Sequence, residues 1–188
     1  MPHDIDVRLY FPSDARRLVE KYISAENEDP DKSSASEILD FNKIIPMPKE
    51  LDVTLKSIDP LTKEGQALQK KYDDNLASFG FQSWYDWSLK NWGTKWNSYS
   101  VEFHANLVQM KTAWYPPGPV IQELARLIHE DIRMTYVDEA YEFWGESFFY
   151  GNGNTPQNHI YTDPGQTPTR LFDELGISEA VAFIRNST

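Results

Sequence analysis

Two tryptophans and a lysine stand close together in the string Trp92-Gly-Thr-Lys-Trp96, and these residue types favour binding chemistry. An indole offers a large apolar face, and an ammonium ion is attracted to the face of an aromatic ring. If Gly93 forms a tight turn, both indoles flank the Lys95 ammonium and can stack on a planar ligand, grip a sugar or anchor a partner peptide. The alternative is that both indoles close the core and Lys95 lies in solvent.

A second string, Thr112-Ala-Trp114-Tyr-Pro-Pro-Gly-Pro119, combines an indole with three prolines and is typical of a rigid platform. The alternative is a stiff connection between a strand and a helix, in which the Trp114 side chain fills space in the core. The two strings converge if the strand before Trp114 lies beside the point where the chain re-enters the sheet after Trp96. We therefore predict a binding surface that draws on Trp92, Lys95, Trp96 and Trp114.

A carboxylate–histidine pair could transfer protons or hold a metal, and Glu102 and His104 share one face of a predicted strand. The chain contains no HxxxH motif. Its four histidines are widely scattered: His3, His104, His129 and His159. Ordinary solvated or hydrogen-bonded histidine is the favoured interpretation, and we predict no catalytic residue.

The densest acidic run in the C-terminal half consists of Asp138, Glu139, Glu142 and Glu146. A divalent cation would require these oxygens to converge, and their spacing fits no calcium-loop pattern. We interpret the run as the solvated rim of a hairpin. The sequence thus predicts no metal site and no cofactor.

Composition narrows the classes of function. The 188 residues include no cysteine, which excludes disulfides, thiolate zinc sites and cysteine nucleophiles and fits a cytoplasmic protein. The formal net charge of −11 and the lack of a basic stripe argue against direct nucleic acid binding. No apolar run approaches the roughly 20 residues that cross a membrane, and no signal peptide is visible. The acidic excess suits a basic partner or simply a soluble surface.

Hydrophobic periodicity predicts the elements that position these residues. Apolar side chains alternate over 5–11, 99–105, 107–114 and 132–137, as in half-buried strands. They recur at helical spacing over 14–24 and 119–130. The order strand, helix, strand, strand, helix, strand is that of a ferredoxin-like βαββαβ fold, with both helices on one face of an antiparallel sheet. The predicted class is therefore α+β.

The remaining segments are predicted additions to this core within a single domain, 1–188. Residues 25–37 are expected to form a mobile loop and 38–48 an extended segment. Residues 49–98 form a predicted helical insertion: one helix opens at Asp59 and Pro60 and ends at Gly80, and another follows Ser83 to about Asn91. The extension, about 143–188, holds a predicted hairpin (143–150 and 157–162), a short helix from Thr167 to Gly176 and a last helix capped by Ser178, carrying Val181, Phe183 and Ile184.

Four strings resemble the YubB-type (Api-like) family of phage and conjugative-plasmid proteins: residues 39–48, 91–97, 112–121 and 143–146. They occur in the family's order and together are specific, and the resemblance spans roughly 38–146. It implies a ferredoxin-like domain and an origin in a mobile element. The family has no established activity, so the resemblance carries no catalytic role to any residue. It marks signature positions without a role: Asn91, Trp92, Gly93, Lys95, Trp96, Thr112, Trp114, Pro116 and Trp144.

These observations favour a non-enzymatic binding protein of a phage or plasmid over an enzyme. Its partner is expected to be a host or element-encoded protein, and counter-defence is one setting in which it could act. A small-molecule or carbohydrate binder with a tryptophan-rich surface is the alternative, followed by an enzyme that uses His104 and Glu102. An RNA binder would share the topology but would need basic residues around an aromatic sheet face. The sequence leaves the oligomeric state open.

Overall fold

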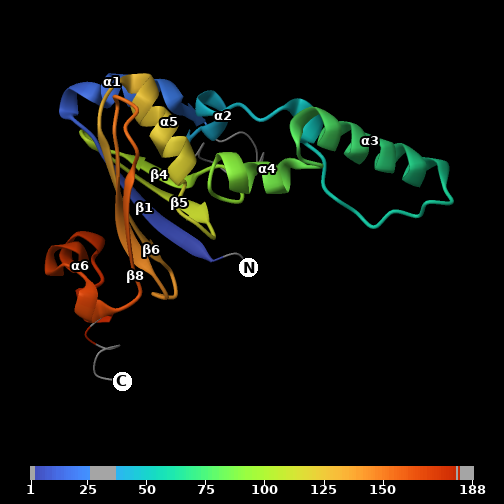
Figure 1. Cartoon of the computed structure of the whole chain (residues 1–188). Helices are drawn as coiled ribbons and strands as arrows, with labels where there is room; N and C mark the ends of the chain where they lie inside the picture. The colour runs from blue at the N-terminus through green and yellow to red at the C-terminus, as the bar shows by residue number, and fades with distance from the viewer. Residues whose placement is uncertain (1–2, 26–36, 181, 183–188) are drawn as a thin grey trace.

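The computed structural model describes residues 3–25, 37–180 and 182, which form an α+β fold around a six-stranded antiparallel sheet (Figure 1). The strands lie in the order β4-β5-β1-β6-β7-β8. Their bounds are β1 Asp4–Tyr10, β4 Tyr99–Phe103, β5 Leu107–Ala113, β6 Ile132–Asp138, β7 Trp144–Phe149 and β8 Gln157–Tyr161. The first four lie in the ferredoxin-like order, so that part of the prediction is confirmed.

Alternation along β1 explains why it lies at the centre of the sheet. Ile5, Val7 and Leu9 are buried on one face, whereas the residues between them are partly or fully exposed on the other. β1 pairs antiparallel with both β5 and β6, with Val7 opposite Met110 on one side and Tyr136 on the other. This register aligns the apolar residues of three strands on one buried face.

Two helical segments cover that face, as Figure 1 shows. The helix α5 (Gly118–Ile128) packs against α1 (Arg16–Val19), and its apolar stripe joins the core that lies over β1. The helix predicted over 14–24 is shorter and irregular. The 3-10 turns η1 (Ser13–Ala15) and η2 (Glu20–Tyr22) flank α1, and the chain becomes extended at Ile23.

Pairing with a distant segment ends that helix early. β2 (Ile23–Ala25) forms a two-stranded antiparallel ladder with β3 (Glu37–Leu39), and Asp40 N–H donates to the carbonyl of Tyr22 at 2.8 Å. The prediction of an extended segment over 38–48 is therefore wrong in part. After β3, the Asp40 side chain caps a short helix, α2 (Phe41–Ile44). The predicted loop at 25–37 falls largely on residues 26–36, outside the described part of the chain.

The insertion is mainly helical, as predicted. The 3-10 turn η3 (Lys49–Leu51) leads to α3 (Lys63–Phe79), which projects away from the sheet, and to α4 (Trp84–Asn91), which packs against α5 (Figure 1). The N-cap of α3 is Thr62 rather than Asp59, because the Thr62 hydroxyl accepts from the N–H of Gly65. Gly80 ends α3 with a φ of 76°, the left-handed conformation expected of it.

The C-terminal extension adds β7 and β8 to the sheet, and its chain then crosses to the opposite face. The 3-10 turn η4 (Pro164–Gln166) precedes α6 (Thr169–Leu175), which Gly176 ends. α6 packs Leu171, Phe172 and Leu175 against Val137 and Trp144 in a second apolar cluster. Ser178 begins a further helical turn, but Val181, Phe183 and Ile184 lie outside the described residues. Among the described residues, no helix is long and apolar enough to cross a membrane.

Candidate functional site

Four aromatic rings and one lysine form a continuous array, which we call the aromatic–lysine strip: Trp84, Tyr85, Lys95, Trp96 and Trp114. The Lys95 Nζ lies 4.5 Å from the centre of the Trp96 ring and 4.3 Å from that of Trp114. Tyr85 meets Trp114 edge-on with their centres 5.9 Å apart, and Trp84 meets Tyr85 at 5.7 Å. The ammonium therefore has two cation–π contacts at the surface, each contributing about 0.5–1 kcal/mol.

Hydrogen bonds bring the two tryptophan strings together, as their predicted convergence requires. The Thr94 hydroxyl donates to the carbonyl of Ala113 at 2.7 Å, at the end of β5. The Ser88 hydroxyl donates to the carbonyl of Lys95 at 2.6 Å, which ties the turn to α4. Thr94 and Ser88 are fully buried, so these bonds hold the Lys95 backbone from inside the fold.

Trp114 has an unusual backbone conformation, with a φ of 75°. This left-handed conformation costs a bulky residue about 1–3 kcal/mol and persists where surrounding contacts impose it. Here the Trp114 N–H donates to the carbonyl of His3 at 2.9 Å, and the Thr112 hydroxyl donates to that of Tyr115 at 3.0 Å. These bonds hold the chain at this turn, where the Trp114 ring lies over the Lys95 ammonium.

The structure corrects the predicted membership of the site. Trp92 is only 4% exposed, and its Nε1–H donates to the carbonyl of Ile45 at 2.9 Å within the core. Its ring meets those of Phe41 and Trp87 edge-on. Trp92 therefore cannot contact a partner directly, whereas Trp96 is 37% exposed. Lys95, Trp96 and Trp114 come together as predicted; Tyr85 and Trp84, which complete the strip, were not among the predicted site residues.

Gly93 turns the chain between the buried and the exposed indole, with a φ of 84°. A Cβ at this position would lie 2.5 Å from Cδ of Pro119, which belongs to the other tryptophan string. We expect Gly93→Ala to lower the free energy of unfolding by about 2 kcal/mol, because backbone strain and a steric clash add. Urea denaturation measures the loss.

Gly153 provides a matched control for this substitution. Its φ is 82°, but a Cβ there would meet no atom within 4 Å. Gly153→Ala thus carries the strain without the clash, and we expect a loss of about 1 kcal/mol. Equal losses in the two variants would contradict close packing between the turn at Gly93 and Pro119.

The carboxylate–histidine pair considered for catalysis lies at the far end of β5. His104 Nε2 is 3.7 Å from Glu102 Oε2, and both side chains are more than half exposed. His104 precedes Leu107, where β5 begins, and Trp114 follows the strand's last residue. Seven residues of strand span about 23 Å, so this pair and the aromatic–lysine strip are separate surfaces.

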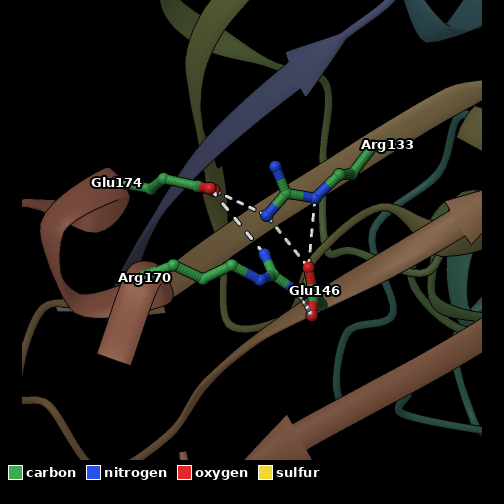
Figure 2. A network of polar contacts seen from close by, with 4 residues as sticks. All are labelled: Arg133, Glu146, Arg170 and Glu174. Atoms are coloured by element: carbon green, nitrogen blue, oxygen red, sulfur yellow. Dashed lines mark hydrogen bonds and ion pairs between the residues drawn. The ribbon is translucent and has the colours of Figure 1, made fainter. Parts of the chain in front are cut away.

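The acidic run forms a solvated rim only in part: Glu139 and Glu142 are exposed, but Asp138 and Glu146 are buried. Glu146 is only 3% exposed and accepts hydrogen bonds from Arg133 at 2.9 Å and from Arg170 at 2.6 Å. Figure 2 shows that Glu174 of α6 completes this four-residue network by pairing with both arginines. Burial raises the pKa of Glu146, but the two guanidinium groups outweigh it and hold that pKa below its ordinary value. The network therefore serves to hold α6 on the sheet.

A polar cluster on the open face of the sheet also has a structural role. The Tyr99 hydroxyl donates to Asp4 Oδ1 at 2.6 Å, and Lys111 Nζ lies 3.2 Å from Asp4 Oδ2. Burial, and then the hydrogen bond to Asp4, raise the pKa of Tyr99 well above its ordinary value. The phenol therefore stays protonated and donates a hydrogen bond to Asp4, so Tyr99 is not suited to act as a base.

Comparison with known proteins identifies one structural likeness. No family model matches the chain, and no curated protein sequence matches it. The fold is similar to the crystal structure of a protein Api92 from Yersinia pseudotuberculosis, described by the family model DUF1281. The match covers 85% of this chain and 98% of that chain, with 10% sequence identity and a TM-score of 0.47. Membership in the YubB-type family stays a prediction.

Proposed function

We propose that this protein is a non-enzymatic binding protein and that the aromatic–lysine strip engages a protein partner. One observation carries the proposal: the Lys95 ammonium is held between two indoles at the surface, 4.5 Å and 4.3 Å from the ring centres. Aromatic side chains are enriched among the residues that dominate protein interfaces, and rigid side chains lose little entropy on binding. The buried hydroxyl bonds of Ser88 and Thr94 supply that rigidity.

Charge suggests what kind of partner the strip would meet. The chain has a net charge of −11, which repels nucleic acid phosphates and attracts basic protein surfaces. We propose a basic partner, encoded by the host or by the same mobile element. The resemblance of the four sequence strings supports a phage or plasmid origin, and the lack of cysteine supports a cytoplasmic setting. Counter-defence would suit such a partner, for example a basic host protein that itself binds nucleic acid.

Quantitative affinity capture tests the proposal. The full chain is immobilised, bound host proteins are identified by mass spectrometry, and the affinity of the recovered partner is measured with each variant. We expect Lys95→Ala and Trp96→Ala each to weaken binding about thirtyfold, the loss typical of an interface hot spot of about 2 kcal/mol. Circular dichroism verifies that both variants remain folded.

Two further variants make the result specific. Lys95→Arg keeps a cation between the indoles and should bind within a few-fold of the unchanged chain. Ile160→Ala removes an exposed apolar side chain from β8, at the opposite edge of the sheet from β4, and should bind normally. Unchanged affinity in both Lys95→Ala and Trp96→Ala would contradict the proposal and would mean that these residues have only a structural role. Binding of oligosaccharides that depends on Trp96 would instead favour the carbohydrate alternative.

A further inference from the structure

A histidine and two carboxylates from distant parts of the sequence meet at one end of the sheet. His3, Asp138 and Glu142 each offer one ligand atom, and these atoms all lie within 4.8 Å of one another. His3 immediately precedes β1, Asp138 ends β6, and Glu142 lies in the turn that leads to β7. Because β1 and β6 are antiparallel neighbours, the start of one lies beside the end of the other.

Asp138 is the fixed member of this cluster. Its side chain is 1% exposed, and Oδ2 accepts from the backbone N–H groups of Ala140 and Glu142 at 3.1 and 3.3 Å. Oδ1 faces Nδ1 of His3 at 3.4 Å. Across residues 3–25 and 37–180, no lysine or arginine forms an ion pair with Asp138. A buried carboxylate without a cation is costly, and a bound metal ion is one of the usual remedies.

The two other members can adjust their positions. His3 is half exposed and Glu142 is exposed, whereas the His3 backbone is held by the bond from Trp114 N–H to its carbonyl. Zinc–ligand bonds of about 2.0–2.1 Å place tetrahedral donors about 3.3 Å apart. His3 Nδ1 already lies 3.4 Å from Asp138 Oδ1, close to that separation, and all three donor atoms lie within 4.8 Å of one another.

We infer that His3, Asp138 and Glu142 form a binding site for a divalent transition-metal ion. One imidazole nitrogen and two carboxylate oxygens are the ligand set of zinc and related ions; calcium and magnesium are bound by oxygens alone. Three protein ligands leave at least one position for water or a ligand. The site is separate from the aromatic–lysine strip, but His3 is linked to it through the backbone bond with Trp114.

Spacing along the sequence does not reveal this site. Asp138 and Glu142 are four residues apart in a turn, and the histidine comes from the other end of the chain, so no local motif joins them. Only the antiparallel register of β1 and β6 brings the three together. The expectation that the acidic run holds no metal rested on spacing within the run alone.

Calorimetric titration of the untagged, chelator-treated full chain with ZnCl₂ tests the inference. We expect binding of one equivalent of Zn²⁺, a rise in the melting temperature, and no comparable rise with MgCl₂. His3→Gln and Glu142→Gln should each weaken zinc binding at least tenfold while leaving the metal-free melting temperature nearly unchanged, because both side chains reach solvent. Asp138 is left intact because its carboxylate also holds the β6–β7 turn.

His104→Gln is the matched control, since this exposed histidine also has a carboxylate neighbour, Glu102. It should bind zinc like the unchanged chain. With Co²⁺ as a spectroscopic probe, His3→Gln should also lose the visible absorption bands of the bound ion. Failure of the unchanged chain to bind zinc, or equal binding by His3→Gln and Glu142→Gln, would overturn the inference. Neither result bears on the protein-binding proposal, whose variants lie at Lys95 and Trp96.

Discussion

Replacing Trp87 with alanine should lower the free energy of unfolding by about 3–5 kcal/mol, as truncation of a buried large aromatic does. Trp87 is 7% exposed and belongs to the main core. Its ring meets Trp92 edge-on with their centres 5.4 Å apart, and Trp92 in turn meets Phe41. Alanine would leave a cavity beneath α4 bordered by rigid rings that cannot collapse into it.

Urea denaturation of Trp87→Ala measures this loss as a shift in the midpoint at an unchanged m-value. Trp96→Ala is the matched control, because it removes the same side chain from an exposed position in the aromatic–lysine strip. We expect it to cost about 1 kcal/mol or less, the contribution of one surface cation–π contact. A midpoint for Trp87→Ala as high as that of the control would mean that α4 does not anchor the insertion to the core.

The alternation of apolar residues predicted the strands, and their helical spacing predicted α5, because each element must place its apolar side chains on one buried face. Ile5, Val7 and Leu9 can be buried together only in an extended segment, and the stripe of α5 fits only a helix. The end of the first helix was not predictable in this way. Ile23 fits the helical stripe, but it is extended because β2 pairs with β3, and the paired residue of Ile23, Leu39, lies in a separate segment of the sequence.

The residue types of the candidate site were predictable from the sequence, but the burial of each side chain was not. Spacing identified the string that holds Trp92, Lys95 and Trp96, yet nothing local distinguishes the indole that faces the core from the one that faces solvent. The difference arises from the turn at Gly93 and from Phe41 and Trp87, which surround Trp92. Tyr85 joins the strip only because α4 packs beside the end of β5, which is a tertiary contact.

The same limit applies to the acidic run. Four carboxylates close together in the sequence indicate a solvated surface unless cations from elsewhere meet them. Arg170 lies 24 residues beyond Glu146, on a helix whose docking the local pattern does not reveal. Arg133 precedes Glu146 by 13 residues on the adjacent strand and faces it because Thr135 pairs with Glu146. The network of Figure 2 is therefore a product of register and of the docking of α6.

Glu146→Gln should destabilise the chain by about 3 kcal/mol, although glutamine has nearly the same shape as glutamate. Removing one partner of a buried ion pair leaves the opposite charge uncompensated, which typically costs 3–5 kcal/mol. The lower end applies here because Arg133 keeps its pairing with Glu174 and Arg170 is half exposed. Glu174→Gln is the control: Glu174 is 31% exposed, so its loss should cost about 1 kcal/mol or less.

Acid provides an independent test of the same network. The arginines hold the pKa of Glu146 below the ordinary value of 4.5 despite its burial. The stabilisation is therefore complete above that ordinary value and is lost as the pH falls through the lower pKa of the folded chain. Denaturation midpoints measured from about pH 6 to about pH 3 should fall more steeply for the unchanged chain than for Glu146→Gln. Two results together would contradict this role of the ion pairs: the same pH dependence of the midpoint in both chains, and equal losses of stability from Glu146→Gln and Glu174→Gln at neutral pH. The apolar cluster around Trp144 would then hold α6 on the sheet alone.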